Sequence, residues 1–214
     1  MSQLLKKGIK EEFISSRYNL KLNHRLSKMK KKIRVHEEHK QKAPKKIILA
    51  LIVVSTSRYE ELQLKKESSD KTIPIVKKVL GKDKSISLEF AEIIPDSEEH
   101  LNDILIRVMK EDTIDAILFS GGTGLSLKDI TYETIEPRLE KKFSGFGELF
   151  RNLSYNEIGS SAMLSRAVAG ILKSNKKSKA VFLLPGSPKA VSLALEALIM
   201  PEIGHILYII NKEE

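Results

Sequence analysis

The sequence predicts an α/β fold in which helices cover both faces of a mostly parallel β-sheet. Three runs of apolar and β-branched residues have the length of buried strands, at residues 47–54, 114–119 and 180–184. Segments with helical spacing of apolar residues lie between these runs. Such alternation is typical of parallel sheets, because parallel neighbours need a long crossover connection.

The positive charge of the chain is concentrated at its N-terminus. Residues 1–46 contain 15 Lys and Arg against 4 Asp and Glu, a net charge of +11, whereas residues 47–214 contain 22 against 24, a net charge of −2. We therefore predict a basic arm, partly helical or disordered, at residues 1–45 and a globular α/β domain at residues 46–214. The arm could be a helix docked on a neighbouring subunit, a segment that contacts nucleic acid or an acidic membrane, or a disordered tail.

Composition excludes several classes of site. The chain has no cysteine, which excludes disulfides and thiolate metal ligands, and its five histidines show no metal-ligand spacing. Ser120 and Ser187 lack the paired His and Asp of a hydrolytic triad. The sequence shows neither a signal-peptide pattern nor an apolar run of transmembrane length, so we expect a cytoplasmic protein that does not bind membranes.

The first half of the domain is expected to contain two helices. A polar loop follows the first strand as far as Ser69, and Gly81 closes the first helix. After a strand at 85–94, Asp96 and Glu99 fit a capping arrangement for the second helix. The inward-facing residues are Ile75, Val76, Val79 and Leu80 in the first helix and Leu101, Ile104, Leu105 and Val108 in the second.

Shorter helices are expected after the strand at 114–119. Thr131 can cap a short helix that Pro137 interrupts, and residues 145–151 lead into a second short helical piece. Ser160 or Ser161 is expected to start a further helix. The residues expected on one side of that helix are Met163, Leu164, Ala167, Val168 and Ile171.

The helix after the strand at 180–184 has a well-specified beginning. Ser187 is a favourable cap, and Pro188 is a favourable first helical residue. A last element at 201–210 closes the chain.

The strand at 114–119 ends in a glycine-rich loop at residues 120–124. Three glycines in four residues allow positive φ angles and leave backbone N–H groups accessible, so the loop could bind a phosphate or the edge of a heterocycle. Its spacing matches neither the dinucleotide fingerprint nor the P-loop. The alternative is a tight turn that binds no ligand.

Ligands of parallel sheets bind beyond the carboxyl ends of the strands. This rule brings Ser57, Asp96, the loop at 120–129 and the loop at 185–189 to one edge. Asp96 and Asp129 could hold Mg²⁺ against phosphate oxygens, unless each carboxylate only caps a helix. Lys189 and Arg151 could contact an anionic ligand or lie in water.

Five separated motifs resemble those of the MoaB/Mog family of molybdenum cofactor biosynthesis proteins. They occupy residues 120–131, 145–151, 157–159, 161–170 and 184–190, and the resemblance covers residues 46–208 but not the arm. It implies a three-layer α/β/α sandwich with a mostly parallel central sheet, a homo-trimer or homo-hexamer, and binding of molybdopterin.

The resemblance also implies an activity. Active members of the family are molybdopterin adenylyltransferases, which use Mg²⁺ and ATP to place AMP on the terminal phosphate of molybdopterin and release pyrophosphate. Asp96 and Asp129 match the family's two essential aspartates, which implies catalytic and Mg²⁺-binding roles for both. The residues expected to bind molybdopterin and ATP are Ser57, Ser120, Gly121, Gly122, Thr123, Gly124, Pro185, Gly186, Ser187, Pro188 and Lys189.

Two positions depart from the family pattern. Lys128 stands where the family usually has Arg, and Asp70 stands where it commonly has Gly, which adds a negative charge near a site meant for phosphates. These changes leave open a non-catalytic molybdopterin-binding paralogue. Nucleic-acid binding through the basic arm is the less favoured alternative.

Overall fold

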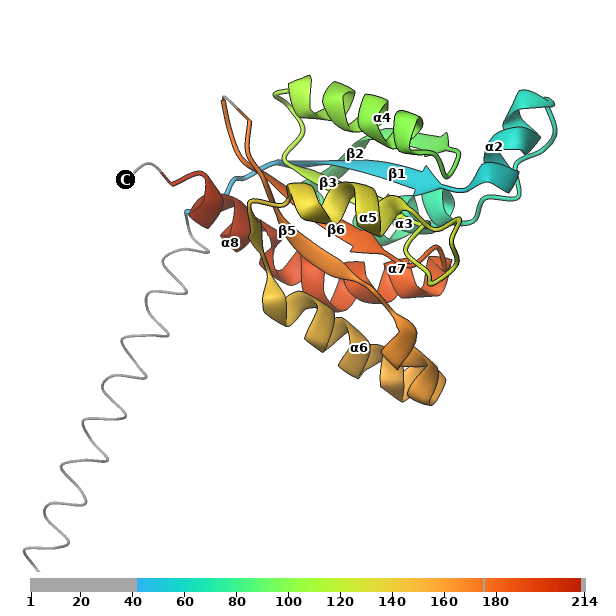
Figure 1. Ribbon diagram of the computed structural model, residues 1–214. Helices are drawn as coiled ribbons and strands as arrows, with labels where there is room; N and C mark the ends of the chain where they lie inside the picture. Colours follow the sequence, from blue (N-terminus) through green and yellow to red (C-terminus); the bar gives the residue numbers. More distant parts are fainter. Residues whose placement is uncertain (1–41, 175, 213–214) are drawn as a thin grey trace, which may run out of the picture. The chain divides into compact units, whose positions relative to one another are not determined.

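The computed structural model describes residues 42–174 and 176–212 (Figure 1). The compact unit of the chain begins at Ala43. Nearly all of the basic arm, and every role suggested for it, lies outside the described residues.

Six strands form one sheet in the order β2-β1-β3-β6-β5-β4. The first four in this order pair in parallel, whereas β5 is antiparallel to β6, and β4 is antiparallel to β5. The predicted mostly parallel sheet is therefore confirmed. The strands are β1 Ile47–Val54, β2 Ile86–Ile94, β3 Ala116–Ser120, β4 Lys141–Lys142, β5 Val168–Leu172 and β6 Lys179–Leu184.

Helices cover both faces of the sheet, which confirms the three-layer fold. One face packs against α4 and α5, and the other packs against α3, α6, α7 and α8. Figure 1 shows α4 on one side of the sheet and α6 and α7 on the other. The helices are α2 Thr56–Gln63, α3 Thr72–Leu80, α4 Glu98–Lys110, α5 Thr131–Ile135, α6 Ser144–Ile158, α7 Pro188–Ala194 and α8 Met200–Ile210, with short helical turns η1 Glu136–Arg138, η2 Gly159–Leu164 and η3 Leu195–Ile199.

The continuous apolar run of β1 follows from its place in the middle of these layers. Side chains alternate between the two faces of a strand. Residues 49, 51 and 53 enter one core and residues 50, 52 and 54 enter the other, all at most 3% exposed. A strand covered on both faces needs apolar residues at every position.

The strand order places a crevice between β1 and β3. The chain leaves β1 for β2 on one side and returns to β3 on the other, so the direction of winding reverses here. Ligands bind at such reversal points, beyond the carboxyl ends of the strands. Ser120 at the end of β3 pairs with Val53 of β1 and Leu184 of β6, so the carboxyl ends of these three strands lie together.

The expected polar loop after β1 instead begins with helix α2. No residue of α2 is buried, so its sequence has no apolar stripe that could have indicated a helix. Its first N–H group, that of Thr56, donates to Asp96 Oδ2 at 3.1 Å. Asp96 is therefore not the cap of α4; that cap is Ser97, whose hydroxyl accepts from the His100 N–H at 3.2 Å.

The helix expected from Ser160 or Ser161 to Ile171 was wrong. The structure has the short turn η2 and then strand β5, which pairs with β6 along its whole length. The close spacing of apolar residues fitted a helix, but hydrogen bonds to a distant strand decided the conformation. On its other edge β5 pairs with β4. Gly170 allows this second pairing, because a Cβ on Gly170 would lie 2.4 Å from the Lys141 carbonyl oxygen.

Two smaller expectations also need correction. The piece at 145–151 belongs to α6, a helix of 15 residues, rather than to a short one. Thr131 is the first residue of α5 and not its cap, and α5 has no side-chain cap. Ser187 and Pro188 do occupy the predicted cap and first helical positions of α7, although the Ser187 side chain makes no capping hydrogen bond.

The last helical segment runs without a break from Pro188 to Ile210 and is long and apolar enough to cross a membrane by length and composition. The expectation that no apolar run has this length was therefore wrong. Residues of this helix with at most 2% exposure belong to the core on one face of the sheet, and this packing accounts for part of its apolar character, since 28% of its most apolar stretch is buried. These residues are Val191, Ala194, Leu195, Ile199, Ile203 and Leu207.

Lys179 is fully buried at the start of β6. Its ammonium group donates to the Val108 carbonyl at 2.8 Å and to the Glu111 carbonyl, and so binds the C-terminal end of α4. Burial, followed by the charge of Lys177, lowers the pKa of Lys179 to about 8. This pKa makes the stability of the domain depend on pH.

A lysine in the unfolded chain has a pKa of about 10.4. Between pH 8 and this pKa, the unfolded chain therefore binds more protons than the folded one. The free energy of unfolding should therefore rise with pH over this interval, by about 1–3 kcal/mol relative to Lys179→Met. Urea unfolding of both proteins at pH 7.5 and pH 10 measures the difference. Lys84→Met, at an exposed lysine, is the control, and a difference independent of pH would contradict the prediction.

Candidate functional site

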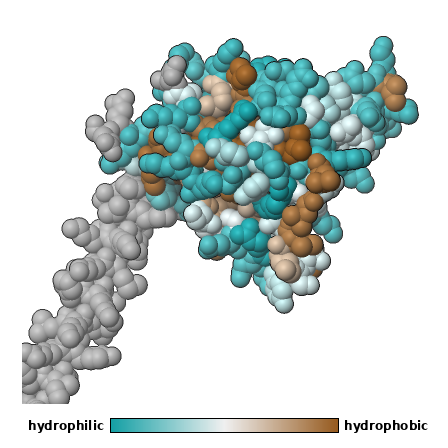
Figure 2. Space-filling model, in the orientation of Figure 1, coloured by the Kyte–Doolittle hydropathy of each residue, from teal (hydrophilic) through white to brown (hydrophobic). Residues whose placement is uncertain are grey.

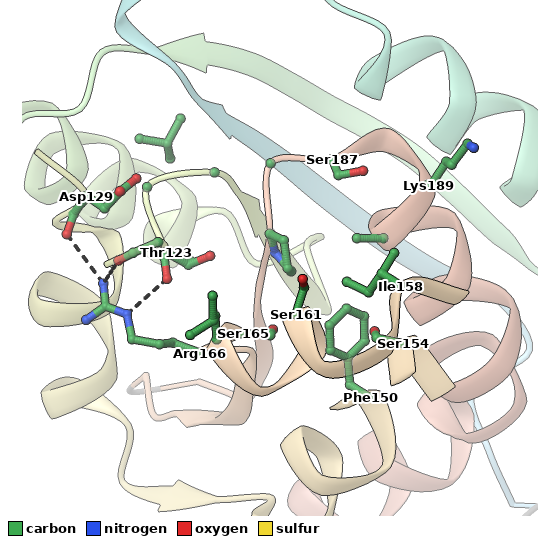
Figure 3. Close-up of a pocket in the computed structure, with 18 of the residues that line it drawn as sticks. Thr123, Asp129, Phe150, Ser154, Ile158, Ser161, Ser165, Arg166, Ser187 and Lys189 are labelled. Carbon is green, nitrogen blue, oxygen red and sulfur yellow. Dashed lines mark hydrogen bonds between the residues drawn. The ribbon is translucent and has the colours of Figure 1, made fainter. Parts of the chain in front are cut away.

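A cleft of about 600 Å³ opens at the edge where β1, β3 and β6 end. Its walls come from the loops after β1, β2, β3 and β6 and from the end of α6 with η2. Figure 3 shows the glycine-loop side with Thr123 and Asp129 and the α6 side with Phe150, Ser154 and Ile158. The cleft thus lies where the strand order predicts a ligand crevice.

The glycine loop packs directly against neighbouring backbone. Gly121 has a φ of +106° and Gly122 a φ of +62°, which are conformations that favour glycine. A Cβ on Gly121 would lie 2.2 Å from the Val54 carbonyl oxygen at the end of β1. The Gly121 N–H donates to the Leu184 carbonyl at 3.1 Å, so the loop links the ends of β1 and β6.

Asp96 and Asp129 both line this cleft. Asp96 Oδ2 accepts from the Thr56 N–H, and Asp96 Oδ1 lies 2.9 Å from the position that a Cβ on Gly122 would take. Asp129 Oδ2 accepts from the Ser126 N–H at 3.1 Å within the same loop. Neither carboxylate is the N-cap residue of the helix that follows it, although Asp96 binds the first N–H group of a different helix, α2.

Arg166 holds the glycine loop from the other side. Its Nε donates to the Thr123 carbonyl at 2.9 Å, and its Nη2 donates to the carbonyls of Gly124 and Asp129, as the dashed lines in Figure 3 mark. Nη1 pairs with Glu133, and this hydrogen bond lowers the pKa of the Glu133 carboxyl, whereas burial opposes the shift. Arg166 thus fixes the backbone that positions Asp129.

The opposite wall of the cleft is apolar with hydroxyl groups at intervals. Its large apolar side chains are Phe150, Ile158, Leu164 and Leu193. The hydroxyl groups on this side are those of Ser154, Ser161 and Ser165. An apolar wall with a few hydroxyls suits a flat heterocycle, which needs contact for its faces and hydrogen bonds for its edges.

Asp70, the departure from the family pattern, does not present a free charge to the cleft. Its side chain is 4% exposed and lies 3.4 Å from Arg58 Nη1. It also accepts from the N–H groups of Thr72 at 3.1 Å and Ile73 at 2.8 Å, at the start of α3. Lys128 is exposed and is not among the residues that line the cleft.

The residues present fit a Mg²⁺ ion that is bound together with phosphate. Within residues 42–174 and 176–212, no group of three or more His, Cys, Asp or Glu side chains could hold a metal ion alone. Mg²⁺ commonly takes only one or two carboxylates and completes its shell with water and substrate phosphates. Asp96 Oδ1 has no hydrogen-bond partner among the described residues and lies at the glycine loop, where it could serve as such a ligand.

The structure brings together most of the residues predicted from the sequence. Ten of them line the cleft: Asp96, Gly121, Gly122, Thr123, Gly124, Asp129, Pro185, Gly186, Ser187 and Lys189. Ser57, Ser120 and Pro188 are not among the lining residues. The Ser120 hydroxyl is buried and donates to the Pro185 carbonyl at 3.2 Å, so it joins two loops instead of facing a ligand.

Ser57 lies beside the cleft but is not among its lining residues. Residues three apart share one face of a helix, so the start of α2 directs Ser55 and Arg58 to the cleft. The Ser57 hydroxyl lies 3.3 Å from the Ser55 hydroxyl, next to this wall. Arg58 was missed because the segment was expected to be a loop. Arg166 and the apolar wall were missed because residues 161–171 were expected to form a helix.

Comparisons with known proteins identify the family to which this fold belongs. Residues 50–205 match the family model described as "Probable molybdopterin binding domain". The chain is 38% identical over 177 residues to "Molybdenum cofactor biosynthesis protein B" of Bacillus cereus, covering 82% of this chain and 98% of that one. It is 40% identical over 163 residues to the "Probable molybdopterin adenylyltransferase" of Methanocaldococcus jannaschii, covering 76% and 93%.

A solved structure has the same fold. The tungsten cofactor synthesizing protein MoaB from Pyrococcus furiosus superposes with a TM-score of 0.68 at 36% identity, covering 78% of this chain and 99% of that one. The fold is therefore that of a molybdenum cofactor biosynthesis protein. The chain belongs to the MoaB/Mog family of these proteins, as the resemblance of its motifs predicted.

We expect Gly121→Ala to destabilise the domain by about 2–4 kcal/mol, because the new Cβ would overlap the Val54 carbonyl oxygen in a strained backbone conformation. Urea unfolding measures this loss. Gly145→Ala is the matched control, since a Cβ on Gly145 in α6 has no neighbour within 4 Å. Equal stability of the two variants would contradict the close packing of the loop.

Proposed function

We propose that the protein acts in molybdenum cofactor biosynthesis as a molybdopterin adenylyltransferase. The observation on which this depends most is that Asp96 and Asp129, from distant parts of the chain, line one cleft beside the same glycine loop. The printed name of the M. jannaschii relative, at 40% identity, supports the same activity.

The polar half of the cleft suits phosphate groups. The glycine loop exposes backbone next to Asp96 and Asp129, and Arg58 and Lys189 line the same cleft with positive charge. Asp96 and Asp129 would hold Mg²⁺, which would neutralise phosphate charge. Phosphates of both substrates would therefore lie against the glycine loop.

The apolar half of the cleft suits the ring systems of the substrates. Phe150, Ile158, Leu164 and Leu193 provide the contact surface for a pterin or an adenine, and the nearby serines can bind ring nitrogens and oxygens. Molybdopterin and ATP both combine a planar heterocycle with phosphate. A cleft with one polar and one apolar half fits both chemistries.

In the proposed reaction, a terminal phosphate oxygen of molybdopterin attacks the α-phosphorus of ATP. The bond from this phosphorus to the oxygen that bridges to the β-phosphate breaks, and pyrophosphate leaves with the electron pair. Such transfers depend on alignment and charge stabilisation more than on covalent help from the protein. Arg166 contributes by fixing the loop that contains Asp129, and Asp96 contributes through its position against Gly122.

The alternative of a non-catalytic molybdopterin-binding paralogue loses one of its grounds. It depended on Asp70 as an unbalanced charge near the phosphates, but this carboxylate is paired with Arg58 and with two N–H groups. Tight molybdopterin binding without consumption of ATP would favour the paralogue.

The assay of choice supplies purified protein with Mg²⁺, ATP and molybdopterin and measures pyrophosphate. We expect release by the wild type and a loss of at least about 100-fold in Asp129→Asn and in Asp96→Asn, the size typical for removal of one preorganised electrostatic group. Asp103→Asn, at an exposed position on α4, is the control and should retain activity. Full turnover by Asp129→Asn would overturn the assignment.

We further propose that the protein assembles into a homo-trimer or homo-hexamer through the apolar surface of α6 and η2. Five of the large apolar side chains that are exposed in the described part of the chain lie on these two elements: Leu149, Tyr155, Ile158, Met163 and Leu164. Figure 2 shows apolar side chains gathered in a band on this side of the molecule. Two of the five also line the cleft, so a second copy there would border the substrates.

Leu149→Glu places a charge on this surface outside the cleft, and burying that charge in an interface would be costly. We expect the variant to dissociate toward the mass of one chain, 24.1 kDa, in light scattering, while the wild type has three or six times that mass. Leu62→Glu, at an exposed residue of α2, is the control. A monomeric wild type would contradict the proposal.

A further inference from the structure

Asp70 and Arg58 form an ion pair at the rim of the cleft that neither the strand pattern nor the motifs indicated. The Asp70 carboxylate is almost fully buried, and both of its oxygens accept hydrogen bonds from the first turn of α3. These bonds fix the carboxylate in one orientation. It can therefore act as a rigid anchor for the guanidinium of Arg58.

Arg58 is the partner that reaches the ligand space. It lies on α2 and lines the cleft together with Ser55, Asp96 and the glycine loop. Its side chain is 22% exposed, and Nη1 lies 3.4 Å from Asp70. Among the described residues the Arg58 side chain makes no hydrogen bond and no other ion pair within 4 Å, although its charge also acts on Glu61, so most of its donors are available.

The other two cations of the cleft differ from Arg58 in this respect. The N–H groups of Arg166 already donate to the carbonyls of Thr123, Gly124 and Asp129 and to the Glu133 carboxylate. Lys189 is exposed, and Figure 3 places it on the opposite side of the cleft from Arg166. Arg58 is thus the cleft guanidinium with free donors, and the planar fork of an arginine suits bidentate binding of phosphate.

We propose that Arg58 binds a phosphate group of the nucleotide and that Asp70 is a positioning residue that orders Arg58 before the nucleotide arrives. A free arginine side chain loses rotamer freedom when it binds, and ordering it in advance removes much of that cost. The proposal rests on the proposed function, because it takes the ligand to be ATP. It gives the Asp at position 70 a role in affinity for phosphate.

Calorimetric titration with ATP and with adenosine, which lacks phosphates, tests the proposal. Loss of a charge-assisted, bidentate contact in Arg58→Met should weaken ATP binding by about 10- to 100-fold and leave adenosine binding unchanged. Asp70→Asn should weaken ATP binding by about 3- to 10-fold, again without effect on adenosine. Asp70→Gly is a second variant in case the first does not fold.

The double variant separates positioning from a merely structural role. If Asp70 acts through Arg58, adding Asp70→Asn to Arg58→Met should weaken ATP binding no further. A merely structural Asp70 would instead weaken ATP and adenosine alike and would add its effect to that of Arg58→Met, which would overturn the positioning role. Arg107→Met, at a surface arginine paired with Glu92 outside the cleft, controls for the loss of one positive charge.

Two further outcomes distinguish this inference from the proposed function. ATP affinity that is unchanged in Arg58→Met, while the wild type releases pyrophosphate, would overturn the inference alone. Failure of the wild type to bind ATP would overturn both.

Discussion

The backbone contact between the glycine loop and the end of β1 is the constraint on which the cleft depends. At Gly121 a Cβ would meet the Val54 carbonyl oxygen at 2.2 Å, and at Gly186 it would meet the Gly121 Cα at 3.3 Å. The loops after β1, β3 and β6 therefore meet through backbone, with no side chains between them. This close approach leaves room above the strand ends for a ligand to contact the main chain itself.

Charged side chains bonded to backbone keep the surrounding loops in place. Arg166 binds the carbonyls of the glycine loop, Asp96 binds the first N–H of α2, and Asp70 binds the first turn of α3. Apolar packing is less suited to this task, because the edge of the sheet faces water. Hydrogen bonds between a charged group and the backbone are directional, so they can fix loops that have little buried surface.

The same arrangement explains why groups from distant segments can act together. Asp96 follows β2 and Asp129 follows β3, yet both line the cleft because parallel strands end at one edge. Gly122 lies between Asp96 and Thr131, with hypothetical Cβ contacts of 2.9 Å and 2.1 Å to their side chains. A larger residue at this position would push Asp96 away from the start of α5, which directly follows the loop that contains Asp129.

The sequence by itself determined the buried strands β1, β3 and β6 and the glycine loop, because these follow from local apolar runs and the residues that end them. It also determined that Asp96 and Asp129 gather at one edge, because the carboxyl ends of parallel strands lie together. Only the tertiary structure decided that residues 168–172 form a strand and that Arg58 lines the cleft. Apolar spacing is a property of neighbouring residues. Strand pairing and the direction of a side chain depend on hydrogen-bond partners far away in the chain, such as β6 for β5 and Asp96 for α2.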